Sequence, residues 1–82
     1  MQKILVTGGL GFIGSNLINI LLKRKYKVIN IDKVSYSSSF YNTKTFSKNK
    51  NYKFIKCDLR NIKKINLILN KFRPKCIFNL AA

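Results

Sequence analysis

Short apolar runs alternate along the chain with longer stretches in which apolar residues recur at helical spacing. The apolar runs predict buried strands at residues 3–7, 27–31, 52–57 and 76–80. Helical spacing predicts helices at residues 12–24 and 61–72. The polar residues between these segments therefore mark the connections.

Each predicted helix has one apolar side. The side chains expected to face the core are Ile13, Leu17, Ile20 and Leu21 in the first helix, and Ile62, Ile65, Ile68, Leu69 and Phe72 in the second. Pro74 ends the second helix because proline lacks the N–H of a helical residue. The long connection at 33–51, rich in Ser and Asn, has room for a short helix.

Strands that alternate with helices indicate an α/β fold with a parallel sheet. Right-handed crossovers place the two helices on opposite faces and give the strand order 3-2-1-4. This is the N-terminal half of a Rossmann-type doubly wound sheet, which we expect to be truncated after strand four. Residues 1–82 would then form a single NAD-binding half-domain, with no catalytic or sugar-binding part.

A glycine-rich segment, Thr7-Gly8-Gly9-Leu10-Gly11-Phe12-Ile13-Gly14, joins the first strand to the first helix. Gly8 permits a tight turn, Gly11 lets backbone N–H groups approach a pyrophosphate, and Gly14 lets the helix pack close to the strand. Phosphate would sit at the positive end of the helix dipole. The motif therefore predicts a dinucleotide site.

Asp32 follows the second apolar run, at the distance from the glycines that a dinucleotide site requires. A carboxylate at this strand end accepts hydrogen bonds from the adenosine ribose and repels a 2′-phosphate. We therefore expect NAD rather than NADP. The alternative is an ordinary turn with a surface aspartate.

The formal net charge of +15 would attract phosphate polymers, and by itself it favours a nucleic-acid partner. The lysines, however, are spread over both helices and the polar connection rather than gathered in a single stripe. We favour a lysine-rich surface over a nucleic-acid interface. The two acidic residues, Asp32 and Asp58, each follow an apolar run, which indicates a role at the strand ends.

The remaining composition excludes several classes of protein. Apolar residues make up 46% of the chain, which favours a folded segment over disorder. No run is long enough for a signal peptide or a membrane span, so we expect a cytoplasmic protein that does not enter membranes. With no histidine and only Cys57 and Cys76, the chain offers no zinc set, and we expect both thiols to be buried and unpaired.

The chain resembles the extended short-chain dehydrogenase/reductase family, whose opening reads Thr-Gly-x-x-Gly-x-x-Gly, as Thr7 to Gly14 do here. Asp32-Lys33-Val34-Ser35-Tyr36 is similar to the segment after strand two in dTDP-glucose 4,6-dehydratases. Two departures leave room for a UDP-sugar epimerase. Ser37-Ser38-Ser39 stands where Ala-Gly is usual, and Asn79 replaces the usual His.

This resemblance implies a role for each matching position. Phe12 and Ile13 would give backbone N–H groups to the pyrophosphate, and Asp32 would hold the ribose. The other implied contacts are Lys33, Val34 and Ser35 beside the ribose, Asp58 and Leu59 at the adenine, and Leu80, Ala81 and Ala82 near the nicotinamide. Ordinary packing or surface positions are the alternatives for these residues.

The resemblance also implies hydride transfer between a nucleotide sugar and NAD, a tyrosine base with a lysine four residues on, and a homodimer for a full-length member. Tyr52 and Lys56 have that spacing, but we reject them because on a strand they lie roughly 13 Å apart. We therefore expect no turnover and weak or no NAD binding by these 82 residues alone. A basic nucleic-acid module and a non-catalytic nucleotide-binding remnant remain alternatives.

Overall fold

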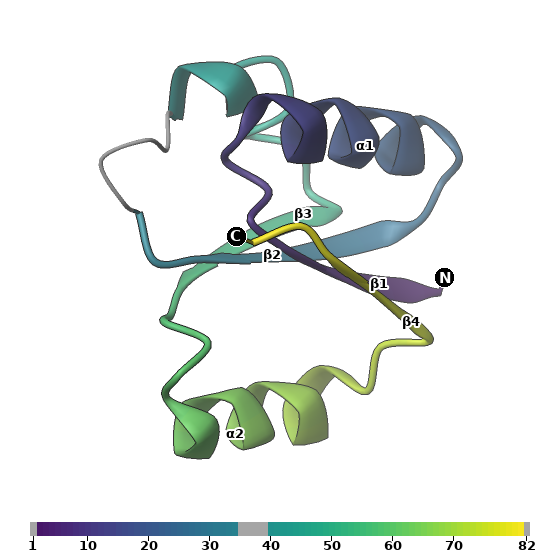
Figure 1. The fold of residues 1–82 in the computed structure, drawn as a ribbon. Helices are drawn as coiled ribbons and strands as arrows, with labels where there is room; N and C mark the ends of the chain where they lie inside the picture. Colours follow the sequence, from purple (N-terminus) through teal and green to yellow (C-terminus); the bar gives the residue numbers. More distant parts are fainter. Residues whose placement is uncertain (1, 35–39, 82) are drawn as a thin grey trace.

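The computed structural model describes residues 2–34 and 40–81, and its centre is a parallel sheet of four strands (Figure 1). The strands are β1 (Lys3–Thr7), β2 (Lys27–Asp32), β3 (Tyr52–Lys56) and β4 (Cys76–Asn79). They lie in the order β3-β2-β1-β4, which confirms the predicted order.

The strand pairing aligns the carboxyl ends of the strands at one edge of the sheet. Thr7 at the end of β1 is level with Ile31 in β2 and with Asn79 in β4. The order reverses between β1 and β4, because β1 leads through its helix to one neighbour and β4 lies on its other side. In open α/β sheets, ligands bind at such a switch point.

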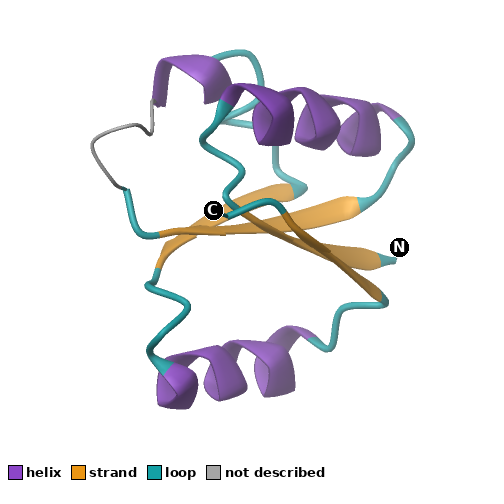
Figure 2. Ribbon diagram, viewed as in Figure 1, coloured by secondary structure: helices purple, strands orange, loops and turns teal. Residues whose placement is uncertain are grey.

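One helix covers each face of the sheet (Figure 2). The helix α1 (Phe12–Lys23) lies on one face, together with the short 3-10 helix η1 (Phe40–Thr43). On the opposite face lies α2 (Ile62–Phe72). The half of a doubly wound fold is therefore confirmed, and so is a short helix within the polar connection.

Successive residues of the strands point to opposite faces and build two apolar clusters. On the α1 face the buried members are Ile4, Val6, Ile18, Leu21, Leu22, Val28 and Phe46. On the α2 face they are Leu5, Ile29, Ile31, Cys57, Ile68 and Phe72. The sheet thus has a small core on each side.

The inward face of α1 differs from the prediction. Ile13 and Ile20 are exposed, whereas Ile18 and Leu22 are buried. The reason lies at the start of the helix, where Gly14 packs against the glycine loop and so sets which side of α1 meets the sheet. Each residue turns a helix by about 100°, so a contact line moved by one residue changes which apolar side chains are covered.

Two other burial predictions are wrong. Ile62 is exposed because it starts α2, and no element of the described chain covers its side chain. Cys76 is exposed because it lies on β4, which pairs only with β1 among the described strands and forms an edge of the sheet. Cys57 is buried as expected, and both thiols are free.

Among residues 2–34 and 40–81, no helix combines the length and apolar character needed to cross a membrane.

Candidate functional site

Gly8 makes the turn that leaves β1. Its φ is 78°, in the left-handed region that favours glycine, and its N–H donates to the carbonyl of Ile31 over 2.9 Å. A Cβ at Gly8 would lie 2.6 Å from the backbone nitrogen of Ala81. Both the backbone conformation and the approach of the chain after β4 therefore require glycine here.

The other glycines of the loop divide into two kinds. A Cβ at Gly14 would lie 2.6 Å from the carbonyl oxygen of Gly8, which confirms that Gly14 allows close packing of the helix. A Cβ at Gly9 would collide with the side chain of Asn30. At Gly11, by contrast, a Cβ would lie 3.6 Å from the carbonyl oxygen of Gly8, an ordinary contact, so the protein itself does not demand glycine there.

The start of α1 presents backbone donors to solvent. Phe12 and Ile13 are the first two residues of the helix, where N–H groups have no acceptor within the helix. Their side chains are 75% and 73% exposed, so neither belongs to the core. The first turn has no acidic residue to neutralise the helix dipole, and such a terminus favours an anion.

The carboxylate of Asp32 points back toward the glycine loop. It is buried, and it accepts hydrogen bonds from the N–H of Leu10 at 3.3 Å and from the N–H of Val34 at 2.9 Å. The second bond turns the chain sharply, and Val34 has a φ of 59°, rare for a β-branched residue. Lys33 between them is exposed, while Ser35 and Ala82 lie outside the described residues.

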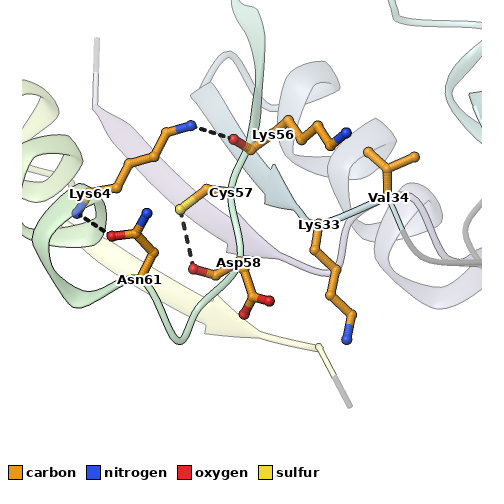
Figure 3. Close-up of a pocket in the computed structure, with 7 residues that line it drawn as sticks. All are labelled: Lys33, Val34, Lys56, Cys57, Asp58, Asn61 and Lys64. Atoms are coloured by element: carbon orange, nitrogen blue, oxygen red, sulfur yellow. Dashed lines mark hydrogen bonds between the residues drawn. The ribbon is translucent and has the colours of Figure 1, made fainter.

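A cavity of about 510 Å³ lies between the segments that follow β2 and β3 (Figure 3). Its lining residues are Lys33, Val34, Lys56, Cys57, Asp58, Asn61 and Lys64. The lysine side chains do not converge on one point in Figure 3, and Lys64 uses its Nζ to donate to the carbonyl of Lys56 over 2.7 Å. The cavity is therefore not a ready-made phosphate site.

Asp58 is held by its neighbour Arg60. The guanidinium Nη2 lies 2.7 Å from Oδ2 of Asp58, and the Arg60 backbone N–H donates to Oδ1 over 2.9 Å. The side-chain hydrogen bond from Arg60 is the main reason that the pKa of Asp58 falls to about 2. The carboxylate expected at the adenine is thus already paired, and the adenine contact stays a prediction.

Leu59 points the other way, into the apolar cluster on the α2 face, where it packs beside Ile65 and Leu69. Its side chain is partly buried against that cluster. The adenine contact of Leu59 stays a prediction, and its backbone is the better candidate for it.

The segment after β4 lies against the glycine loop, as predicted. The N–H of Leu80 donates to the carbonyl of Thr7 over 2.9 Å, and Ala81 is the neighbour that limits Gly8. The hydroxyl of Thr7 also donates to Oδ1 of Asn79 over 2.6 Å. The two sides of the switch point are thus joined directly.

The sequence did not indicate that three polar side chains hold the glycine loop in place. They are Asn30, Tyr52 and Asn42. Asn30 is fully buried on β2, and its Oδ1 accepts the N–H of Gly9 at 2.9 Å. Its Nδ2 donates to the hydroxyl of Tyr52 over 3.1 Å. Asn42 donates to the carbonyl of Leu10 over 3.1 Å. The available signal was an asparagine inside an apolar strand, since a buried amide needs partners.

Tyr52 and Lys56 lie on a strand, as predicted, rather than on one turn of a helix. Both residues lie on β3, where the Tyr52 hydroxyl is bound to Asn30 and Lys56 is exposed. In the described part of the chain, no group of three or more His, Cys, Asp or Glu side chains is placed to hold a metal ion.

Known proteins with similar sequences include several dTDP-glucose 4,6-dehydratases. The dTDP-glucose 4,6-dehydratase of Haemophilus influenzae is 40% identical over 83 residues, which cover 100% of this chain and 25% of that protein. A probable dTDP-glucose 4,6-dehydratase of Sinorhizobium fredii is 38% identical over 99% of this chain and 23% of its own length. The chain thus spans about a quarter of the length of these relatives.

Solved structures of nucleotide-sugar enzymes also superpose on this chain. The dTDP-glucose 4,6-dehydratase of Bacillus anthracis in complex with NAD superposes with a TM-score of 0.94 at 37% identity, covering 100% of this chain and 27% of that one. The UDP-glucose 4-epimerase of Thermotoga maritima gives 0.86 at 36% identity, covering 99% of this chain and 24% of that one.

The family model described as GDP-mannose 4,6 dehydratase matches residues 5–82, which is nearly the whole chain. The resemblance to nucleotide-sugar dehydratases is therefore confirmed, and this chain belongs to the GDP-mannose 4,6 dehydratase family.

Proposed function

We propose that this chain is the NAD-binding segment of a nucleotide-sugar 4,6-dehydratase. The observation that carries the proposal is the loop from Gly8 to Gly14, which places the open N-terminus of α1 beside the buried carboxylate of Asp32. The relatives and the NAD complex of the Bacillus anthracis dehydratase support it.

Each part of the loop has a role in this proposal. The pyrophosphate would lie over Gly11, where a side chain is absent, and accept from the N–H groups of Phe12 and Ile13. The ribose hydroxyls would donate to Asp32, whose charge would repel the 2′-phosphate of NADP. Bound NAD would supply the hydride acceptor for sugar oxidation.

Lys33, Val34 and the undescribed Ser35 would flank the ribose. Leu80, Ala81 and the undescribed Ala82 would line the nicotinamide side of the cleft, where Ala81 already lies against Gly8. For the adenine we propose the backbone around Asp58 and Leu59, because the Asp58 carboxylate is engaged by Arg60.

The chain on its own would not complete the reaction. Its only Tyr-x-x-x-Lys spacing is the strand pair already rejected, so a catalytic base and the sugar pocket would come from sequence outside these 82 residues. A homodimer, a cytoplasmic location and a nucleotide-sugar substrate are predictions for a full-length member. A UDP-sugar epimerase stays the alternative; epimerase structures also superpose on this chain, and they do not support it better than the dehydratases support the proposed function.

A chimera tests the proposal. This chain would replace the matching N-terminal segment of the Haemophilus influenzae dTDP-glucose 4,6-dehydratase, and the purified product would be titrated with NAD and NADP and assayed with dTDP-glucose. We expect a preference for NAD and measurable turnover. The Asp32→Asn variant keeps the side-chain shape, so it should weaken NAD binding by about tenfold and narrow the preference over NADP.

A chimera that folds with the circular dichroism of the parent but binds no NAD would refute the proposal. The isolated 82 residues provide the second measurement, and calorimetric titration should show weak or no NAD binding because a marginal fold must be stabilised before it binds. Micromolar affinity would contradict that expectation.

A further inference from the structure

Asn30 is a fully buried polar side chain on β2, and it lies on the same face of the sheet as the apolar cluster under α1, between Val28 and the buried Asp32. Its neighbours on that face include Val28 and, across the sheet, Val6. Burying an amide among apolar groups is unfavourable unless its hydrogen bonds are satisfied. The hydrogen-bond partners of Asn30 should therefore explain why an asparagine is buried at this position.

Those partners determine which way the amide points. The N–H of Gly9 is a donor only, so the atom 2.9 Å from it must be the oxygen of Asn30. The amide nitrogen then faces the hydroxyl of Tyr52 at 3.1 Å, and a hydroxyl can accept from it. The chemistry of both contacts allows one orientation of the side chain.

Tyr52 is itself held in place. Its ring packs edge to face on the ring of Phe46, with 4.9 Å between the centroids, and Phe46 is buried. Burial is the main cause that raises the pKa of the Tyr52 phenol, so the hydroxyl stays neutral near pH 7. A fixed neutral hydroxyl thus supports the amide from β3, on the far side of β2 from the glycine loop.

We propose that Asn30, oriented by Tyr52, is a positioning residue that holds the Gly8–Gly11 loop ready for the pyrophosphate. The inference rests on the proposed function. Gly9 packs so closely on the Asn30 amide that a Cβ could not fit, which ties the middle of the loop to the sheet. A loop ordered in advance spares the ligand the entropy of ordering it.

The first test needs no ligand. Amide hydrogen exchange of the 82-residue chain, followed by NMR at low temperature, would compare Gly9 with Val6 in the centre of β1. Global destabilisation accelerates both amides, whereas loss of the loop anchor accelerates Gly9 alone. We expect the ratio of the two rates to rise about tenfold in Asn30→Leu and to rise less in Tyr52→Phe.

Tyr26→Phe is the matched control. Tyr26 packs on the same apolar cluster but precedes β2, at the end of the sheet away from the glycine loop, and its substitution should leave the ratio unchanged. Should Asn30→Leu fail to fold, Tyr52→Phe still decides, because it removes one oxygen and keeps the ring. An unchanged ratio in Tyr52→Phe, or an unprotected Gly9 amide in the unaltered chain, would overturn the inference.

The second test links the loop to the ligand. In the chimera with the Haemophilus influenzae dehydratase, NAD titration should give a Kd about fivefold weaker for Tyr52→Phe than for Tyr26→Phe. An absence of NAD binding by the unaltered chimera would count against the proposed function. The exchange ratio would still decide whether Asn30 positions the loop.

Discussion

Three of the four glycines occupy sites where any side chain would collide. Gly8 and Gly14 face backbone atoms, and Gly9 faces a buried amide. A Cβ at Gly11 would make only an ordinary van der Waals contact, 3.6 Å from the carbonyl oxygen of Gly8, and in the proposed function this is the glycine that a pyrophosphate would cover. Gly8, Gly9 and Gly14 are therefore required by packing of the protein, whereas for Gly11 we propose that the requirement is access for a ligand.

Replacing Gly14 by alanine should destabilise the fold by roughly 1–2 kcal/mol, because α1 must move away from the loop and the gain in helix propensity offsets only part of that cost. Denaturant unfolding would measure it. Gly11→Ala is the comparison, with an expected cost below about 1 kcal/mol from the poorer N-cap. Equal costs for the two variants would contradict the distinction between packing and access.

At the scale of elements, the end of α1 has the hydrogen bonds of a Schellman motif. The N–H of Tyr26 donates to the carbonyl of Leu21, and the N–H of Lys25 donates to that of Leu22, both over 3.1 Å. Lys25 has a φ of 70°, the conformation that glycine usually supplies at this position. The helix therefore ends in a Schellman motif, but the residue in the left-handed conformation is a lysine, for which that conformation is unfavourable.

Lys25→Gly should stabilise the protein by about 0.5–1 kcal/mol, since it relieves the left-handed strain at some cost in unfolded-state entropy. Lys23→Gly removes the same side chain two residues earlier, inside the helix, and should destabilise by about 1 kcal/mol. Thermal unfolding of the pair checks both signs. A destabilised Lys25→Gly would show that the lysine side chain contributes more than its backbone costs.

The whole molecule combines a small core with a large positive charge. Its formal net charge is +15, and its principal extents are 32 × 31 × 18 Å. At about 0.01 M salt the screening length is roughly 30 Å, so nearly all of the lysines repel one another. At about 0.15 M it is near 8 Å, and only close neighbours still do.

Thermal stability should therefore rise when NaCl is raised from about 0.01 to about 0.15 M. Replacing the exposed Lys48, Lys50 and Lys53 by glutamine should flatten that dependence, because these residues add charge without a described ion pair. Calorimetric melting at several salt concentrations tests both statements. A melting temperature that falls with NaCl in the unaltered chain would contradict them.

The described chain also leaves apolar surface uncovered on the whole molecule. Four large apolar side chains are at least half exposed: Phe12 and Ile20 on α1, Leu67 on α2 and Ile77 on β4. The relatives are about four times as long, as the covered fractions of their chains indicate. Thin burial on both faces of the sheet is the physical reason to expect marginal stability from these 82 residues.

Patterns local to the chain, with the handedness of crossover connections, were enough to predict the order and kind of the elements, the strand order and the tight glycine turn after β1. A strand alternates its side chains, a helix repeats every 3.6 residues, and a tight turn excludes side chains, so neighbouring residues carry these signals. The position of Asp32 beside the glycine loop was predicted in the same way, because its distance from the glycines is a property of the sequence, and its contact with a ribose stays a prediction.

The tertiary structure alone decided which apolar residues are buried and how the site is held together. Packing of Gly14 on the loop set the rotation of α1, and the edge position of β4 exposed Cys76. The contact from Tyr52 through Asn30 to Gly9 joins three distant parts of the chain. Such contacts depend on how closely strands and helices approach one another in space. Periodicity along the sequence does not encode the distance between residues that are far apart in the chain.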